Sequence, residues 1–220
     1  MASELRFAIG AYSIADAARF LRQSVASVRR WSNGYTYRQR ELVRHRHPVL
    51  VTDRRAPGVL NFAEIVELRF VAAFRRAGVS LEHLRRAART LEPTYGPYPF
   101  ANARLIAHGG TLLEMKEWGA VSPVTRQHVL AGLEAYVAEL GFVDDLAARW
   151  EPKEGLGKVL LDPTRQFGQP ILAASGTPTR VVFREFNLDP EAESIAEWYG
   201  LEPDDVKAAV SFERAFAAAG

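Results

Sequence analysis

The feature that most constrains the fold is a pair of short helical patterns between Ser13 and Gly34, each with its own start signal. Ser13 stands three residues before Asp16, a capping-box-like spacing in which the hydroxyl accepts a free backbone N–H and the carboxylate favours the positive helix end. The first pattern has one apolar stripe, made of Ile14, Ala17, Ala18 and Leu21. The second begins at Ser24, ends at Gly34 and has an expected buried side of Val25, Val28 and Trp31. Two short helices joined by a turn of a few residues predict a helix-turn-helix.

The second helix of a helix-turn-helix projects its N-terminal, solvent-facing side chains towards a DNA groove. In this sequence those side chains are Ala26, Ser27, Arg29 and Arg30. Small residues let the helix backbone approach the groove, and arginine can donate two hydrogen bonds to guanine O6 and N7 or bind a phosphate. We therefore expect Ser27, Arg29 and Arg30 to contact base edges, with Ser24 at the start of the same DNA-binding helix.

The next stretch mixes aromatic and basic side chains and is expected to form a basic wing. Its tyrosines and arginines are Tyr35, Tyr37, Arg38, Arg40, Arg44 and Arg46, and a strand-like run follows at 49–52. Arginines without acidic neighbours repel one another unless a partner neutralises them, which favours a DNA-binding wing over the alternative of an ordinary solvated loop. The expected DNA contacts in the wing are Tyr35, Tyr37, Arg38 and Arg40, the last three on phosphates.

Charge is distributed unevenly along the chain, although the formal net charge is only +2. Residues 1–90 contain 17 Arg, no Lys and 7 acidic residues, a formal charge of +10. Residues 91–220 contain 11 basic and 19 acidic residues, a formal charge of −8. The first part suits a polyanion and the second would be repelled by one, which disfavours a purely structural adaptor without DNA contact.

Two more helical patterns, beginning at Asn61 and Ser80, complete the expected N-terminal domain, residues 1–92. The second pattern is expected to place its arginines on the outside: Arg85, Arg86 and Arg89. Three prolines and a glycine in 92–100 predict a linker. In a central region, residues 93–150, we expect a hairpin at 104–114 and a long helix over 122–140 closed by Gly141, whose apolar stripe is either a core contact or a dimer seam.

The C-terminal region, residues 151–220, is expected to combine short strands at 159–162, 171–173 and 180–183 with a second helix-turn-helix at 191–199 and 203–218. From Asp189 to Val206 there are seven acidic residues and no Lys or Arg, so DNA would be repelled. We expect a protein-contact module with candidate anchors that could instead be core residues: Trp198, Tyr199 and Phe212. The predicted fold class is mainly α with small β elements, or α+β.

No pattern in the sequence predicts an enzyme, a metal site or a cofactor. Without cysteine the chain has no disulfide or thiolate ligand, which favours a reducing compartment. The phosphate-loop-like run at 155–158 lacks the required spacing, and no further ligand completes a metal site at His45 and His47. Asp144 and Asp145 are adjacent and are expected to point apart. With no apolar run near about 18 residues, we expect a cytoplasmic protein without a membrane partner.

Two stretches resemble known families. Residues 12–38 (YSIADAARFLRQSVASVRRWSNGYTYR) and the segment 58–91 resemble MerR-like regulators, and residues 165–213 resemble the C-terminal domain of VapB-like antitoxins. The positions that carry the second likeness are Pro170, Ile171, Gly176, Thr177, Arg180, Val181, Tyr199, Gly200 and Leu201. In this chain Pro178 and Thr179 interrupt the Gly-Thr-Arg motif of that family.

The resemblance implies an antitoxin of a type II toxin–antitoxin pair. Such a protein would silence a VapC-like PIN-domain ribonuclease and, as a homodimer on operator DNA, repress its own operon. The resemblance does not assign the residue that blocks the toxin's cleft. The alternative is a MerR-like effector-sensing transcription regulator in which residues 100–220 hold a small molecule.

Overall fold

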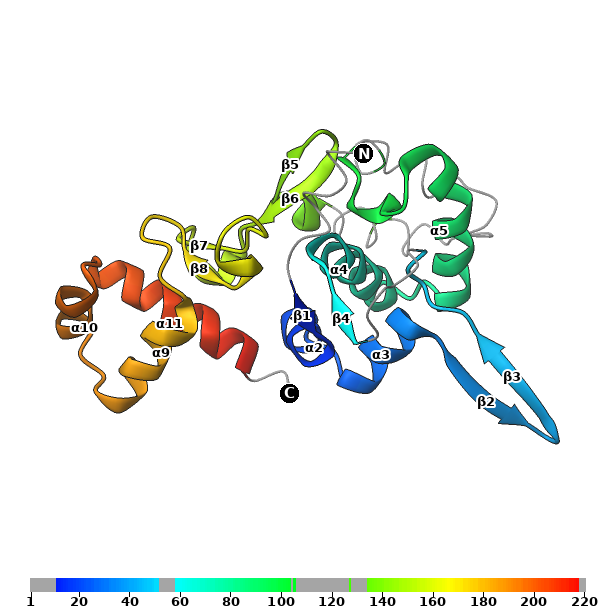
Figure 1. Cartoon of the computed structure of the whole chain (residues 1–220), viewed down its shortest axis with the longest axis horizontal. Coiled ribbons are helices and arrows are strands. Elements are labelled where there is room, and N and C mark those ends of the chain that lie inside the picture. The colour runs from blue at the N-terminus through cyan, green and yellow to red at the C-terminus, as the bar shows by residue number, and fades with distance from the viewer. Residues whose placement is uncertain (1–10, 52–57, 104, 106–126, 128–133, 218–220) are drawn as a thin grey trace.

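A computed structural model describes residues 11–51, 58–103, 105, 127 and 134–217. The helix-turn-helix lies along the lower edge of the N-terminal half in Figure 1. After strand β1 (Tyr12–Ser13), the two helices are α2 (Ile14–Leu21) and α3 (Val25–Asn33). Ser13 and Asp16 form the predicted capping box, Ser24 caps α3, and Gly34 ends α3 with φ at 72°. Val28 and Trp31 are buried as expected, but Val25 is 41% exposed, because it lies in the first turn of α3.

The core of this half is built by two longer helices, α4 (Phe62–Arg76) and α5 (Leu81–Tyr95), with strand β4 (Val59–Leu60) paired to β1. Phe70 stacks on Phe74 with ring centroids 4.0 Å apart and on Phe100 at 4.3 Å. Phe100 belongs to the short 3₁₀ helix η1 (Pro99–Ala101), which is buried.

The expected linker over 92–100 is therefore wrong. Helix α5 continues through Pro93 to Tyr95 and ends at Gly96, where φ is 80°. Tyr98 and Phe100 are then buried in the core. The prolines shape the end of α5 and the entry into η1, and this segment contributes to the packing of the N-terminal half.

The predicted wing is an antiparallel hairpin of β2 (Tyr35–Gln39) and β3 (Leu42–Arg46) that projects from the body (Figure 1). The strand expected at 49–52 is wrong for the residues described there, since Val49 and Leu50 are buried loop residues and not part of a sheet. The extended strands lie earlier, where Tyr35 to Arg46 pair with one another.

A second hairpin, β5 (Leu140–Val143) and β6 (Leu146–Trp150), joins the two halves of the chain. Gly141 lies inside β5, so the expectation that it closes a helix running to Leu140 is wrong. A Cβ at Gly141 would lie 2.4 Å from Nε of Arg149, which explains a glycine in this strand. Asp144 and Asp145 form its turn. The hairpin expected at 104–114, apart from Leu105, and most of the helix expected at 122–140 fall outside the described residues.

The C-terminal unit begins with η3 (Lys153–Gly155), β7 (Val159–Leu160), η4 (Gln166–Gly168) and β8 (Ile171–Leu172), the two strands being paired. Three helices follow: α9 (Thr179–Leu188), α10 (Ala192–Tyr199) and α11 (Pro203–Ala217). The strand expected at 180–183 is wrong. Its β-branched residues favour a strand locally, but Pro178 opens a helix in which Thr179 and Val182 are buried.

The C-terminal unit packs directly on α2 of the helix-turn-helix. Arg19 and Glu213 form an ion pair at 2.6 Å, and Thr179 donates a hydrogen bond to the same carboxylate at 2.5 Å. Tyr12 donates to the carbonyl of Gly168 at 2.7 Å, and burial raises the pKa of the Tyr12 phenol. The Tyr12–Gly168 and Arg19–Glu213 contacts each span more than 150 residues of sequence, and the buried residues of the two halves form one continuous core.

The fold class predicted from the sequence, mainly α with small β elements, is confirmed. The described strands form four two-stranded antiparallel sheets among the helices. Within the described ranges, no helix combines the length and the apolar composition needed to cross a membrane.

Candidate nucleic-acid interface

The N-terminal part of α3 presents its polar side chains to solvent. Arg29 and Arg30 are exposed, and Ser27 is half-buried. The Arg29 guanidinium makes no hydrogen bond or ion pair with any residue that the structure describes, and the Arg30 guanidinium donates only to the carbonyl of Ala26, one turn earlier, at 3.2 Å. Both guanidinium groups therefore keep free donors that can reach a base edge or a phosphate.

Ser24 has a mainly structural role in α3. Its hydroxyl accepts the backbone N–H of Ser27 at 3.2 Å and donates to the Ser27 hydroxyl at 3.0 Å. This cap fixes the first turn of α3 and the orientation of Ser27. DNA contacts by Ser24 and Ser27 remain predictions.

The two faces of the wing carry different side chains. Cross-strand partners lie on the same face of a hairpin, and Tyr35 pairs with Arg46 while Tyr37 pairs with Arg44. On this face the two tyrosine rings are 5.8 Å apart, and the guanidinium of Arg46 lies 5.9 Å from the ring of Tyr37.

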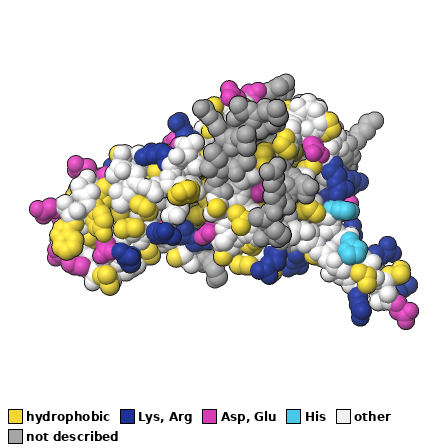
Figure 2. All heavy atoms as spheres, viewed as in Figure 1, with side chains coloured by type: hydrophobic (Ala, Val, Ile, Leu, Met, Phe, Trp, Pro, Cys, Tyr) yellow, Lys and Arg dark blue, Asp and Glu magenta, His cyan; other side chains and the backbone are white. Residues whose placement is uncertain are grey.

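Arg38 lies on the opposite face of the wing, across from Val43, and Arg40 is at the turn with a φ of 56°. Tyr37 and Arg38 therefore cannot contact the same row of phosphates. A hairpin inserted into a groove would instead meet one wall with each face. Figure 2 shows Arg and His side chains along this projection.

The base of the wing is fixed to α5 by a residue that sequence reasoning placed on the surface. Arg85 is only 7% exposed, and its Nε donates to the carbonyl of His47 at 2.7 Å; burial lowers the pKa of this guanidinium. Arg46 pairs with Glu82 at 3.2 Å. The expectation of an outward Arg85 is wrong because the segment after β3 folds over that side of α5, which the helical periodicity does not reveal.

Sequence reasoning also missed two arginines beside the reading helix. Arg75 and Arg76 end α4 and line an open groove of about 370 Å³ together with Ser27 and Arg30 of α3. Arg75 donates to the carbonyl of Val79 at 2.8 Å. The groove brings positive charge from α4 to the same side as α3, which enlarges the basic surface available to a phosphate backbone.

The C-terminal candidates divide into exposed and buried side chains. Trp198 is 85% exposed and Tyr199 is 37% exposed, both at the end of α10, and Leu188 at the end of α9 is 77% exposed. Phe212 is fully buried and packs on Phe216 with ring centroids 4.8 Å apart, so its expected role as a surface anchor is wrong. The helical stripe that includes Phe212 faces the core of the C-terminal unit.

Replacing Arg38 by alanine tests the wing without disturbing its base. Arg38 is exposed, so the fold should be unaffected. Loss of one phosphate contact should weaken DNA binding about equally for all sequences and reduce the slope of log K against log salt by about 0.9. Fluorescence anisotropy over a salt series measures this slope, with Arg149→Ala on β6 as the matched control. An unchanged slope would remove Arg38 from the interface.

Two parts of the chain match known protein families. Residues 10–88, which include α2, α3, the wing and α4, match the family described as "Putative DNA-binding HTH domain". Residues 159–212, which run from β7 into α11, match the family described as "Protein of unknown function (DUF433)". The helix-turn-helix predicted from the sequence is confirmed by the first match.

Over nearly its whole length the chain is similar to a protein of Mycobacterium tuberculosis named "Putative antitoxin VapB45", with 28% identity over 227 residues, covering 94% of this chain and 95% of that protein. It is also similar to the crystal structure of Rv2018 from M. tuberculosis, with a TM-score of 0.72 and 25% identity, covering 93% of this chain and 99% of that one. The resemblance to VapB-like antitoxins with a helix-turn-helix is therefore confirmed.

Proposed function

We propose that this protein is the antitoxin of a type II toxin–antitoxin pair, which binds operator DNA through its N-terminal domain and a toxin through its C-terminal domain. The observation that carries the proposal is the separation of charge on the folded chain. Exposed arginines occupy α3 and the wing, whereas the opposite end of the molecule carries acidic side chains (Figure 2). On α10 these acidic residues flank Trp198, which is 85% exposed. The full-length similarity to a named antitoxin supports it.

The DNA-binding part of the proposal assigns base contacts to Ser27, Arg29 and Arg30, and backbone contacts to the wing. The assigned wing residues are Tyr35, Tyr37, Arg38 and Arg40. We propose residues 1–92 as the DNA-binding domain, 93–150 as the dimerisation region and 151–220 as the toxin-binding region. A homodimer would place two reading helices on two half-sites of the operator.

We propose a VapC-like PIN-domain ribonuclease as the toxin. The exposed Trp198 and Tyr199 would anchor it, and the acidic side chains around them suit a partner with a basic rim. In this proposal the chain performs no catalysis and acts in the cytoplasm, where its operator lies. Repression of its own operon follows if the toxin gene and the antitoxin gene share the promoter it binds.

Co-expression with the protein encoded by the neighbouring reading frame tests the proposed pair. We expect a neighbour with PIN-type carboxylates, co-purification of the two proteins, and loss of the neighbour's ribonuclease activity in the complex. A gel shift with the shared promoter should show binding by this chain alone. Failure of the two proteins to associate would overturn the antitoxin role, and the gel shift judges the DNA-binding role separately.

Trp198→Ala is expected to weaken toxin binding by about 2 kcal/mol, because truncation of an aromatic anchor removes a large desolvated contact. The substitution should not alter folding, since the ring is 85% exposed. Isothermal titration calorimetry with the purified toxin measures the change. Phe167→Ala is the matched control, because Phe167 is also an exposed aromatic residue, at 75%, but lies in η4. Equal affinities of the Trp198 variant and the wild type would exclude Trp198 as an anchor.

A further inference from the structure

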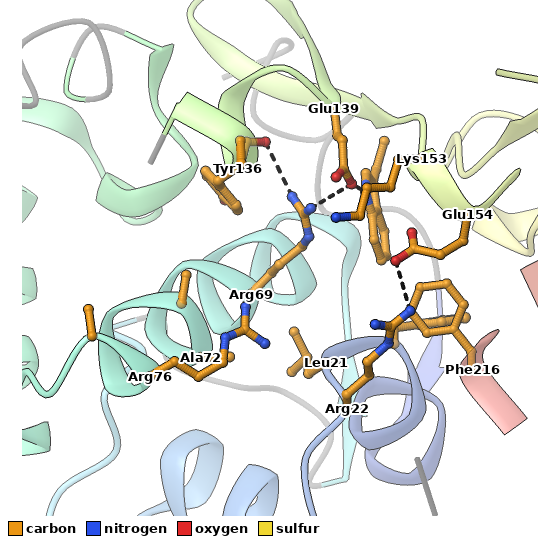
Figure 3. Close-up of a pocket in the computed structure, with 15 residues that line it drawn as sticks. Leu21, Arg22, Arg69, Ala72, Arg76, Tyr136, Glu139, Lys153, Glu154 and Phe216 are labelled. Carbon is orange, nitrogen blue, oxygen red and sulfur yellow. Dashed lines mark hydrogen bonds and ion pairs between the residues drawn. The ribbon is translucent and has the colours of Figure 1, made fainter. Parts of the chain in front are cut away.

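A cavity of about 470 Å³ lies where the helix-turn-helix meets the C-terminal unit (Figure 3). Its walls come from α2, α4, β6, η3 and α11. This volume is within the range of small-molecule sites in proteins. Neither Arg29 nor Trp198 lines it, and Arg76 is the one arginine it shares with the basic groove beside α3, so the proposed DNA and toxin contacts do not account for the rest of its lining.

The lining of this cavity has more positive than negative charge. Two cations are paired inside it: Arg22 with Glu154 at 2.8 Å and Arg69 with Glu139 at 2.6 Å. The side chains of two more, Arg76 and Lys153, make no hydrogen bond or ion pair with the residues that the structure describes. The lining therefore has an excess of two positive charges, which a ligand carrying two negative charges would neutralise.

One face of α4 forms a flat wall of the cavity. Its members follow helical spacing and, apart from the two arginines, have only methyl side chains: Arg69, Ala72, Ala73, Arg76 and Ala77. Ala72 is buried, whereas Ala73 and Ala77 are partly exposed and border the cavity. The alanines leave room for a planar group between the two arginines.

The two paired guanidinium groups lie over aromatic rings. Arg69 lies 4.9 Å from the ring of Tyr136 and 4.7 Å from that of Trp150, and Arg22 lies 4.9 Å from the ring of Phe216. Arg69 has rings from two residues beside it. Arg22 has one, and its side chain is 43% exposed, so its other face is available to a second flat group. The cavity thus combines free positive charge with flat surfaces.

We propose that this cavity binds a small organic dianion with a flat ring, of the nucleoside monophosphate class. The phosphate would pair with Arg76 and Lys153, and the base would lie against the alanine face of α4 and the free face of the Arg22 guanidinium. Because Arg22 belongs to the helix-turn-helix and Lys153 to the C-terminal unit, the bound ligand would bridge the two halves of the chain.

Isothermal titration calorimetry of the full chain with the four nucleoside 5′-monophosphates, AMP, GMP, CMP and UMP, tests the proposal. At least one should bind, and the corresponding nucleoside and inorganic phosphate should each bind at least tenfold more weakly. Arg76→Ala and Lys153→Ala should each weaken binding at least tenfold. Both side chains are exposed and unpaired among the described residues, so the fold should persist.

Two control variants make the result specific. Arg184→Ala on α9 removes an exposed arginine away from the cavity, and the double variant Arg29→Ala/Arg30→Ala removes the reading arginines; both should bind the nucleotide as the wild type does. The proposal is overturned if none of the four nucleotides binds, if the Arg76 and Lys153 variants bind as tightly as the wild type, or if inorganic phosphate alone binds as tightly as the nucleotide.

Discussion

Replacing Arg29 and Arg30 together by alanine is expected to weaken operator binding by roughly 2–6 kcal/mol, since each arginine at a base edge contributes about 1–3 kcal/mol. Both side chains are exposed on α3, and the only hydrogen bond that the structure gives for them within the described residues is that of Arg30 to its own helix. The helix is capped by Ser24 and ended by Gly34, which the substitutions do not touch. Titration of labelled operator at constant salt measures the loss.

The matched control for this experiment is Arg184→Ala, which removes the same charge from the acidic C-terminal unit. We expect unchanged operator affinity in that variant. The single variants should show which base pair each arginine reads, because specificity would relax at one operator position in each. If the double variant binds the operator as tightly as the wild type does, α3 is not the reading helix.

Replacing Glu213 by alanine is expected to lower the free energy of unfolding by about 3 kcal/mol, at the lower end of the range for breaking a buried ion pair. The carboxylate is almost fully buried and accepts hydrogen bonds from both Arg19 and Thr179. Without it the Arg19 guanidinium, whose side chain is 30% exposed, loses its partner, and Thr179 keeps only the longer acceptor, the carbonyl of Pro170 at 3.4 Å. Denaturant titration followed by circular dichroism measures the change.

Two control variants test whether the loss of stability comes from the buried ion pair or from the removal of any acidic side chain. Glu213→Gln keeps the shape and an acceptor oxygen, and should lose less stability than Glu213→Ala. Asp204→Ala breaks the exposed pair with Lys207, with side chains 72% and 60% exposed, and should leave stability unchanged within measurement. If Glu213→Ala is as stable as the wild type, the contact between α11 and α2 does not hold the two halves together.

Local signals allowed the helix-turn-helix and the last two helices to be predicted from the sequence. Ser13 and Ser24 start helices, and Gly34 and Gly200 end them, through bonds that involve neighbouring residues only. The strand expected at 180–183 failed because two local signals compete there. The β-branched pair Val181 and Val182 favours a strand, and burial against α11 decides for a helix.

The candidate site was predictable where it depends on exposure and not where it depends on tertiary contacts. Arg29 and Arg30 were expected on the surface from helical spacing, and they lie there. The burial of Arg85 requires a carbonyl 38 residues away, and the pairing of Arg19 with Glu213 joins residues 194 apart. No periodicity in the sequence contains that information, because it arises only when the elements pack.

Hydrogen–deuterium exchange of the full chain, with and without operator duplex, tests most directly the claim that one end of the chain binds DNA and the other end binds protein. We predict slower exchange in α3 and the wing on DNA binding, with α10 and α11 unchanged. Slower exchange in α10 and α11 on addition of DNA, with α3 and the wing unaffected, would contradict the claim.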